Sequence, residues 1–527
     1  MTQYIKAFLT PAAACASLLL AGCGGSDGAA IAPDMRQNTA QQACDALKGK
    51  AISGATIGSA TLVAAASPTP AYCKITAKID PSLNFELRLP DSWNGKLYYG
   101  GGGGYNGAIP DASGFNLAAL RQGYATVNSD SGHQGSPVDA SFALNDPNAA
   151  QLFGSLSIPT VMSSALDMVK AAYGAAPKHA YFEGCSNGGR EALMTAQRYP
   201  NLFDGIIARA PAYNWVGFMG AFNRTAVALA APGGQFTNAK LALLARSVRE
   251  ACDGKDGIVD GMVSNPAACS ASDFNPVSLR CAGGADSGDS CLSDAQLAVV
   301  ESWTTPAVFS GSPTYRNAGW QLSGNEDDPG AWPAWVTGGG NVQGALQFLF
   351  QDTTVKNYLA RSPSANSLTY GAFDQNPNAL YALEALNSAT STDLRPFKNS
   401  GGKLILWHGT NDAALSYKST TEYYLGLQTR FGSPAAVAEF AQFYLAPAVD
   451  HCAGGPGADT GDLLTALDNW VDKSTAPGTL VASRFAVDGK AELSRPLCPY
   501  PQYPRYTGPA NDAQAGKLAV NFTCTQP

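Results

Sequence analysis

The sequence EGCSNGGRE, residues 183–191, places a serine, Ser186, where it could act as a nucleophile. A predicted strand (179–185) precedes the G-x-S-x-G pattern and a predicted helix follows it, which is the context of a nucleophile elbow. Such a tight turn lifts the serine hydroxyl above the edge of a sheet and aims the backbone N–H of Asn187 at a developing oxyanion. The alternative interpretation is a glycine-rich turn with an inert serine.

A nucleophilic serine needs a base, and the chain offers only four histidines: His133, His179, His408 and His451. His179 lies at the start of the strand that leads to Ser186, so we expect it at the wrong end of the sheet. His133 lies in a loop and could line a pocket, and His408 lies at a strand end. His451 follows the last predicted strand of the sheet, and we predict that it is the base.

The acid that orients this histidine should lie between Ser186 and His451, because the α/β-hydrolase triad has the chain order Ser, Asp, His. Asp412, in HGTNDAA just past the predicted strand 403–409, satisfies that order. Its alternatives are a solvated turn residue or a local Asx cap. Asp450 is a rival acid, but its side chain should project away from its neighbour His451.

Five consecutive glycines, Gly100–Gly104, follow the strand residues KLYY directly. Glycine lets backbone N–H groups approach a ligand closely, and a second oxyanion donor is expected from a loop after an early strand. A flexible connector is the alternative.

A cysteine stands beside each of two predicted catalytic residues. If Ser186 and His451 are in hydrogen-bond contact, Cys185 and Cys452 come close enough for a disulfide, which needs Cα atoms about 4.4–6.8 Å apart. The alternative is a reactive free thiol. Beyond the N-terminal region the chain has ten cysteines, an even number that indicates five disulfides in an exported protein. Zinc ligation is disfavoured because the sequence has no CxxC pair.

The N-terminus resembles an export signal. Lys6 precedes a short apolar stretch that ends in Leu-Ala-Gly-Cys23, which is similar to a bacterial lipobox. We predict a signal peptide over 1–22, a lipid anchor on Cys23 and a flexible tether over 23–43. The expected location is the outer membrane or periplasm as a lipoprotein, with ordinary secretion as the alternative.

The composition indicates a large globular enzyme-sized protein. Of 527 residues, 45% are hydrophobic and 14% charged, and the net charge of −7 disfavours a nucleic-acid partner. Strand-like and helix-like segments alternate over 94–211 and again over 403–474, which predicts an α/β sheet. Between them the alternation is lost. We therefore predict one catalytic domain, 44–212 and 396–527, interrupted by an inserted domain over 213–395.

The sequence CDGKDGIVDGM, residues 252–262, crowds Asp253, Asp256 and Asp260 together. Carboxylates this close repel one another unless a cation joins them, and oxygen ligands suit calcium. Ser264 stands where an EF-hand would have its last glutamate, so this is not an EF-hand. A solvated Asp/Gly turn is the alternative.

The motifs GCSNGGR, HGTNDA and DHCAGG together closely resemble the tannase/feruloyl esterase family of α/β-hydrolases, from about Cys44 to the C-terminus. The resemblance implies a lid inserted in the sheet domain and oxyanion donors at Gly104 and Asn187. It implies a structural calcium site in the lid, completed by the carbonyls of Ile258 and Met262. It also implies five disulfides: Cys44–Cys73, Cys185–Cys452, Cys252–Cys269, Cys281–Cys291 and Cys498–Cys524.

The family resemblance implies a serine carboxylesterase acting on small esters of aromatic acids, such as hydroxycinnamic or gallic acid, or on mono(2-hydroxyethyl) terephthalate. The predicted lid has aromatic residues that could stack on such a ring or form its core: Trp303, Trp320, Trp332, Trp335, Phe348 and Phe350. The terephthalate branch has a lid arginine, and Asn341 falls at its place here. The competing function is a polyphenol- or carbohydrate-binding lipoprotein without activity.

Overall fold

The computed structural model describes residues 38–510 and 512–527. The predicted signal peptide, Cys23 and most of the predicted tether lie outside the described residues. Helix α1 (Ala40–Leu47) begins inside the expected tether, because Thr39 and Gln42 form a capping box and the helix buries an apolar face. Helix α1 therefore begins four residues before Cys44. Residues 38–527 form one compact unit.

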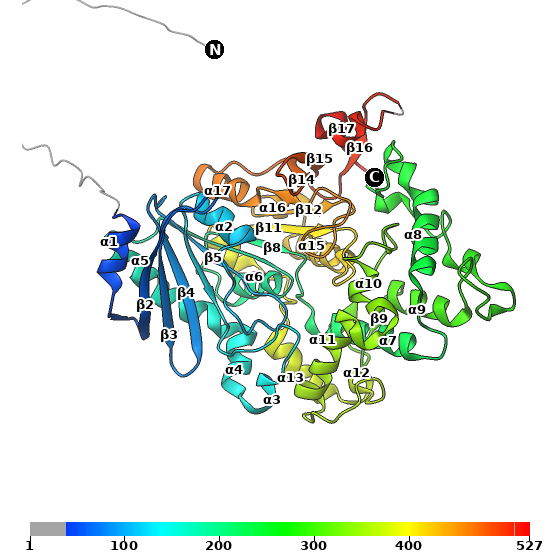
Figure 1. Ribbon diagram of the computed structural model, residues 1–527, viewed down its shortest axis with the longest axis horizontal. Coiled ribbons are helices and arrows are strands. Elements are labelled where there is room, and N and C mark those ends of the chain that lie inside the picture. Colours follow the sequence, from blue (N-terminus) through cyan, green and yellow to red (C-terminus); the bar gives the residue numbers. More distant parts are fainter. Residues whose placement is uncertain (1–37, 511) are drawn as a thin grey trace, which may run out of the picture. The chain divides into compact units, whose positions relative to one another are not determined.

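A ten-stranded sheet forms the centre of this unit, in the order β1-β2-β3-β4-β6-β5-β7-β8-β11-β12 (Figure 1). Strands β1 to β4 pair in antiparallel fashion and β4 pairs antiparallel with β6, whereas β6, β5, β7, β8, β11 and β12 are parallel. The predicted α/β class is confirmed. The strands are β1 (Ala51–Ile52), β2 (Ala55–Val63), β3 (Tyr72–Ile79), β4 (Leu83–Pro90), β5 (Lys96–Gly100), β6 (Ala125–Ser129), β7 (His179–Cys185), β8 (Gly205–Arg209), β11 (Lys403–Gly409) and β12 (Ala441–Ala446).

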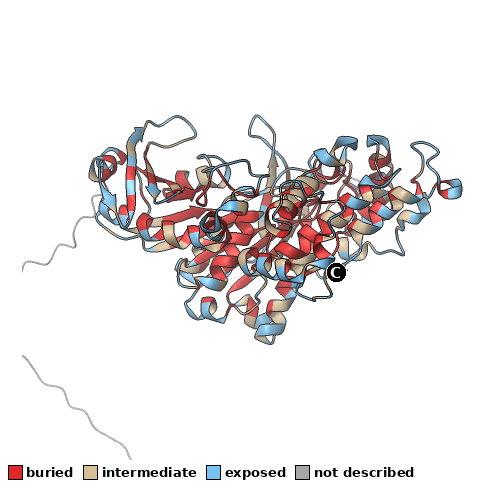
Figure 2. Cartoon of the chain, turned by 90° about the horizontal axis from the view of Figure 1, so that it is seen from below, coloured by how far each residue is buried: buried red, intermediate tan, exposed pale blue. Residues whose placement is uncertain are grey.

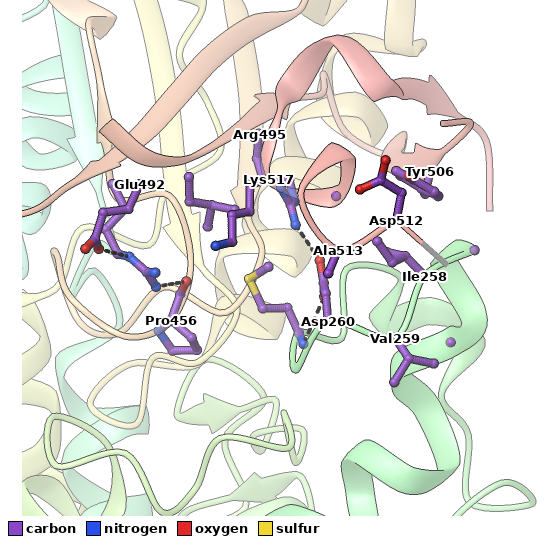
Figure 3. A pocket seen from close by; sticks show the side chains of 16 residues that line it. Ile258, Val259, Asp260, Pro456, Glu492, Arg495, Tyr506, Asp512, Ala513 and Lys517 are labelled. Atoms are coloured by element: carbon purple, nitrogen blue, oxygen red, sulfur yellow. Dashed lines mark hydrogen bonds and ion pairs between the residues drawn. The ribbon is translucent and has the colours of Figure 1, made fainter. Parts of the chain in front are cut away.

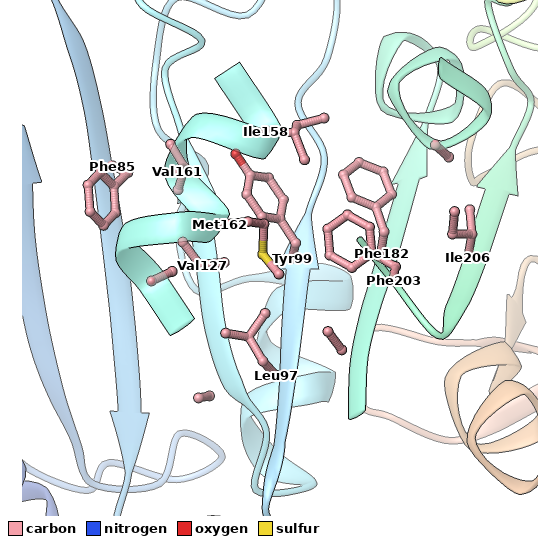
Figure 4. Close-up of a cluster of buried hydrophobic side chains, with 14 of the residues drawn as sticks. Phe85, Leu97, Tyr99, Val127, Ile158, Val161, Met162, Phe182, Phe203 and Ile206 are labelled. Atoms are coloured by element: carbon pink, nitrogen blue, oxygen red, sulfur yellow. The ribbon is translucent and has the colours of Figure 1, made fainter. Parts of the chain in front are cut away.

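Helices cover both faces of the parallel strands. Helix α5 (Ser157–Tyr173) packs on strands β4 and β6, and its Val161 and Met162 belong to the large apolar cluster drawn in Figure 4. On the other face, α17 (Leu463–Lys473) buries Leu467 with residues of β7 and β11. The strands are buried on both sides, as Figure 2 shows. Their sequences are therefore continuous apolar runs rather than alternating apolar and polar residues.

The segment between β8 and β11 adds no strand to the central sheet among the described residues. It forms helices and one two-stranded hairpin around an apolar cluster in which Trp303 stacks on Trp320 and packs edge-on against Trp332. This inserted segment (210–402) is green to yellow in Figure 1. Its main elements are α7 (Trp215–Ala230), α8 (Asn238–Cys252), α9 (Asp294–Thr304), β9 (Ala307–Val308), β10 (Arg316–Asn317), α10 (Trp332–Trp335), α11 (Leu346–Thr354), α12 (Ala372–Gln375), α13 (Pro377–Asn387) and α14 (Arg395–Asn399).

The remaining elements lie on loops of the sheet and at the C-terminus. The C-terminal part of the chain forms two small antiparallel sheets, β13-β14-β15 and β16-β17. These elements are α2 (Gly114–Arg121), α3 (Phe142–Asn145), α4 (Pro147–Gln151), α6 (Asn187–Arg198), α15 (Tyr417–Phe431), α16 (Pro434–Ala438), β13 (Thr460–Gly461), β14 (Leu480–Phe485), β15 (Ala491–Leu497), β16 (Tyr503–Tyr506) and β17 (Phe522–Thr525).

Five disulfides cross-link the described residues, with the pairing that the family resemblance implied: Cys44–Cys73, Cys185–Cys452, Cys252–Cys269, Cys281–Cys291 and Cys498–Cys524. A disulfide content of this kind is typical of exported proteins, because the cytoplasm keeps thiols reduced.

Candidate active site

Ser186 occupies a strained turn between β7 and α6. Its φ of 63° lies in the left-handed region, which a non-glycine residue rarely adopts. The turn is crowded: a Cβ on Gly184 would come 2.5 Å from the carbonyl carbon of Gly188, and one on Gly188 would come 2.8 Å from the carbonyl oxygen of Gly102. The glycines around Ser186 are therefore required by close backbone contacts, as in a nucleophile elbow.

His451 and Asp412 form a hydrogen-bonded pair at the carboxyl edge of the sheet. His451 Nδ1 lies 2.8 Å from Asp412 Oδ2, so the ring presents Nε2 to its other side. Ser186 and His451 line the same open cavity of about 470 Å³. Within the described residues no hydrogen bond joins Ser186 to His451, and catalytic hydrogen bonds are often long before substrate binds. The structure thus brings Ser186 and His451 to one cavity, with Asp412 buried behind His451.

The Asp412 carboxylate is buried and fully engaged. Its Oδ1 accepts the backbone N–H groups of Ala414 and Leu415, both at 2.8 Å. Its Oδ2 is shared by His451 and a second histidine, His408, at 3.0 Å. Burial acts to raise the pKa of Asp412, but the two histidines hold that pKa well below its usual range. This carboxyl therefore stays charged. His408 lies at the end of its strand, four residues before Asp412 in the sequence, and this spacing brings both side chains together.

The other candidates lie elsewhere. His179 is near Asp204 and Asp472 at the start of β7, as its position predicted. His133 is buried, stacks on Phe142 and lies with Nε2 2.8 Å from the Tyr105 carbonyl oxygen. Asp450 accepts a hydrogen bond from Asn411 rather than from His451, which agrees with the expected direction of its side chain.

Gly104 and Asn187 present backbone N–H groups beside Ser186. Gly104 has φ +57°, and a Cβ there would come 2.2 Å from the Pro137 carbonyl oxygen, so only glycine fits. Within residues 38–527 neither N–H has a protein acceptor, because Asn187 is the first residue of α6 and the Gly104 N–H makes no backbone bond. Both groups are available to an oxyanion.

Glu191 ties the glycine loop 100–104 to the start of helix α6. It accepts hydrogen bonds from the Gly102 N–H at 3.0 Å, from Asn106 Nδ2 at 2.7 Å and from Asn187 Nδ2 at 3.1 Å. One buried carboxylate thereby ties the glycine loop to helix α6. The sequence analysis did not identify this residue.

Cys185 and Cys452 are bonded, with Cα atoms 5.9 Å apart. The disulfide joins the residue before Ser186 to the residue after His451, and its two cysteines line the same cavity as these residues. The loop that contains His451 is therefore tied covalently to the nucleophile turn.

A second cavity beside Ser186 is apolar. Of the described residues that line it, none carries a charge, and Ser186 and Asn187 supply its polar groups. Trp335 and Phe350 separate it from the open cavity, lining both, and Trp335 packs edge-on against His451 with ring centroids 4.9 Å apart. The remaining apolar wall comes largely from helix α7: Trp215, Phe218, Met219 and Phe222.

Only part of the expected aromatic set reaches this cavity. Trp303, Trp320 and Trp332 belong to the core of the inserted segment, and of the other three residues Trp335 and Phe350 line the cavity. Asn341, which the resemblance places at the position of a lid arginine, is exposed and caps a short turn by accepting the Gln343 N–H.

The acidic stretch 253–262 forms a buried turn at the wall of a separate cavity of about 870 Å³ (Figure 3). Asp256 Oδ2 is buried and has no hydrogen-bond partner among the described residues. Burial, together with Asp260 and Asp253, raises the pKa of Asp256 to about 7. Asp260 is instead paired with Arg495, and among the described residues no three acidic, histidine or cysteine side chains converge as a metal site.

The family model described as tannase and feruloyl esterase matches residues 69–524. The chain belongs to the tannase and feruloyl esterase family. The resemblance stated from the motifs is thereby confirmed, and as a member of the tannase and feruloyl esterase family this chain is a carboxylic ester hydrolase.

Relatives of the chain in this family include bacterial and fungal proteins. Mono(2-hydroxyethyl) terephthalate hydrolase of Piscinibacter sakaiensis is 33% identical, over 89% of this chain and 87% of that protein. A probable feruloyl esterase of Arthroderma benhamiae is 29% identical, over 83% and 82%. The solved structure of feruloyl esterase B from Aspergillus oryzae has a TM-score of 0.80 at 23% identity, covering 92% of this chain and 100% of that one, which shows a shared fold.

Proposed function

We propose that this member of the tannase and feruloyl esterase family is a serine esterase for esters of aromatic acids of the hydroxycinnamic or gallic type. The proposal is carried by one observation: an apolar, aromatic-lined cavity opens at Ser186, opposite an open cavity that reaches His451. The first cavity has a volume of about 20 Å³, so it must widen to admit an aromatic acyl group, and the open cavity of about 470 Å³ has room for the alcohol part.

In the proposed mechanism Ser186 Oγ attacks the ester carbonyl carbon while His451 Nε2 accepts its proton. Asp412 stabilises the imidazolium that forms, and the N–H groups of Gly104 and Asn187 hold the oxyanion. His451 then passes the proton to the leaving alcohol, which yields an acyl-enzyme on Ser186. Water repeats the sequence, with His451 as base, and releases the acid.

The terephthalate monoester of the Piscinibacter sakaiensis relative is the alternative substrate. Its free carboxylate would enter a cavity whose described lining has no cation, and an unpaired charge is costly to bury. Uncharged aromatic acyl groups are therefore the better fit, and we expect a lower kcat/KM for the carboxylated ester.

The test is turnover of methyl hydroxycinnamates, a gallate ester and mono(2-hydroxyethyl) terephthalate by the wild type and by Ser186→Ala. We expect Ser186→Ala to lose activity on all of them by roughly 10⁴-fold or more, and Ser364→Ala, an exposed serine, to keep it. Unchanged turnover in Ser186→Ala would mean that the esterase site lies elsewhere, and would leave a binding function for this cavity. Preference for the terephthalate ester would refute the uncharged acyl site.

We also propose that calcium binds the stretch 253–262 as a structural ion. Support comes from the donor chemistry: three carboxylates within eight residues, an unpartnered buried oxygen on Asp256, and carbonyl oxygens of Ile258 and Met262 that accept no hydrogen bond from the described residues. Asp253, Asp256, Asp260 and these two carbonyls would hold the ion, which would neutralise buried charge.

We further propose that the mature chain begins at an acylated Cys23 and is held at a membrane by that anchor. The support is the sequence Leu-Ala-Gly-Cys followed by small residues. Cys23→Ser should move the protein from the membrane fraction to the soluble fraction, and a mature N-terminus other than Cys23 would refute the anchor.

A further inference from the structure

The catalytic carboxylate has a second histidine that the mechanism above does not use. His408 Nε2 lies 3.0 Å from Asp412 Oδ2, the same oxygen that His451 approaches at 2.8 Å. His408 is fully buried on β11 and lines neither cavity at Ser186. It therefore cannot touch a substrate there, and any effect on the reaction must pass through the residues that it contacts, Asp412 first among them.

The hydrogen bonds of His408 define its tautomer. Nε2 faces two acceptors, Asp412 Oδ2 and the Leu415 carbonyl oxygen at 2.9 Å, so Nε2 must have the hydrogen. Nδ1 lies 2.9 Å from the Thr420 hydroxyl, which can donate to it. With the Thr420 hydroxyl as the donor to Nδ1, an uncharged ring satisfies all three contacts.

A donor to a carboxylate draws off part of its negative charge, and it also fixes the direction of the shared oxygen. The titratable groups around Asp412 are His408 on β11, and His451 and Asp450 on the loop after β12, while Thr420 on α15 adds only a neutral hydroxyl. Of these, His408 and His451 donate to the same oxygen.

We infer that His408 is a positioning residue that limits how strongly Asp412 attracts the proton of His451. With this second donor in place, His451 can remain unprotonated and accept the proton of Ser186 at a lower pH than it otherwise could. The inference rests on the proposed roles of Asp412 and His451.

Two substitutions separate the donor from the bulk of the ring. The amide nitrogen of His408→Gln can reach the place of Nε2 and donate to Asp412, whereas that of His408→Asn reaches only the place of Nδ1. The readouts are kcat and KM separately and the pH profile of kcat/KM, measured after circular dichroism shows a folded protein. Thr420→Val is the matched control, because it removes the contact at Nδ1 and leaves the donor at Nε2.

We expect His408→Asn to lose kcat by about tenfold to a hundredfold, since a misplaced catalytic group costs that much. The acid limb of its pH profile, where kcat/KM falls as pH decreases, should move to higher pH by about one unit. A shift of that size is equivalent to the loss of one charge-assisted hydrogen bond. KM should change little. His408→Gln and Thr420→Val should keep the wild-type limb. A limb that does not move in folded His408→Asn, or one that moves equally in Thr420→Val, overturns the inference.

A second measurement needs no change at position 408. The ring nitrogens of only four histidines appear in a ¹⁵N NMR spectrum of the wild-type protein, and we expect His408 as the neutral Nε2–H tautomer. A charged or Nδ1–H ring overturns the inference even if His408→Asn does not fold. If Ser186→Ala loses esterase activity and the pH profile of His408→Asn is unaffected, this inference alone is wrong. If Ser186→Ala keeps its esterase activity, the proposed function is wrong.

Discussion

Asn411 Nδ2 donates a hydrogen bond to Asp450 Oδ1, one residue before the point at which Asp412 binds His451. The two catalytic loops are therefore joined at two consecutive positions. Asn411 Nδ2 also lies 3.3 Å from the carbonyl oxygen of Asn325, so the same amide reaches the inserted segment.

Asp450 should make stability depend on pH. Burial first, and then the neighbouring carboxyl of Asp328, raise the pKa of Asp450, so the folded protein holds a proton that the unfolded chain releases at lower pH. Its contribution to stability is complete below about pH 4, the unfolded value, and is lost as pH rises through the raised pKa. In Asp450→Asn, the melting temperature should fall less than in the wild type between pH 5 and 9. The exposed Asp80→Asn is the control, and identical curves for all three would contradict this assignment.

The disulfide beside the triad should matter for turnover as well as stability. Closing a loop of 267 positions stabilises by up to about 5 kcal/mol on the chain-entropy model, less where other bridges already constrain the chain. Cys185→Ala with Cys452→Ala should lower kcat even at temperatures where circular dichroism shows a folded protein. Cys281→Ala with Cys291→Ala, which opens a loop of only 10 positions, should cost stability and leave kcat unchanged. Equal kcat in both double variants would show that the Cys185–Cys452 bond has no catalytic role.

Calcium removal should lower stability more than it lowers the rate. EDTA is expected to reduce the melting temperature of the wild type, and Asp256→Asn to be insensitive to EDTA because its buried oxygen no longer needs a counter-ion. Asp273→Asn, at a half-exposed acid in the same segment, should respond as the wild type does. Metal analysis that finds no calcium in folded protein would reject the site.

A cation placed in the apolar cavity should change substrate preference. Phe350→Arg should raise the ratio of terephthalate-monoester to hydroxycinnamate kcat/KM by about tenfold or more, since a charge-assisted hydrogen bond contributes about 1.5–3 kcal/mol. Phe350→Leu controls for the lost ring and should weaken both esters without changing their ratio. A ratio that is the same in both variants would place the acyl group outside this cavity.

The catalytic motifs could be predicted because each is local. Strands 179–185 and 403–409 have the bounds expected for them. The residue types that follow each strand indicate the kind of reaction. Helix α7 gave no such signal: its run from Trp215 to Phe222 is apolar on every face, so it has no helical period, and its contact with Ser186 depends on long-range packing. The antiparallel strands β1 to β4 were missed for a related reason, since sheet pairing is set by partners distant in sequence.

The connectivity of the cysteines sets a condition on how this protein is made. Four of the five disulfides join cysteines that are neighbours in the sequence, whereas Cys185 passes over four cysteines to reach Cys452. If cysteines paired in the order in which they leave the export channel, Cys185 would bond to Cys252 and the errors would continue to Cys452. The correct bond forms only after nearly the whole chain has emerged, by exchange through mixed disulfides. A host that oxidises thiols but lacks a disulfide isomerase will therefore accumulate full-length protein in which Cys185, the neighbour of Ser186, is bonded to the wrong cysteine.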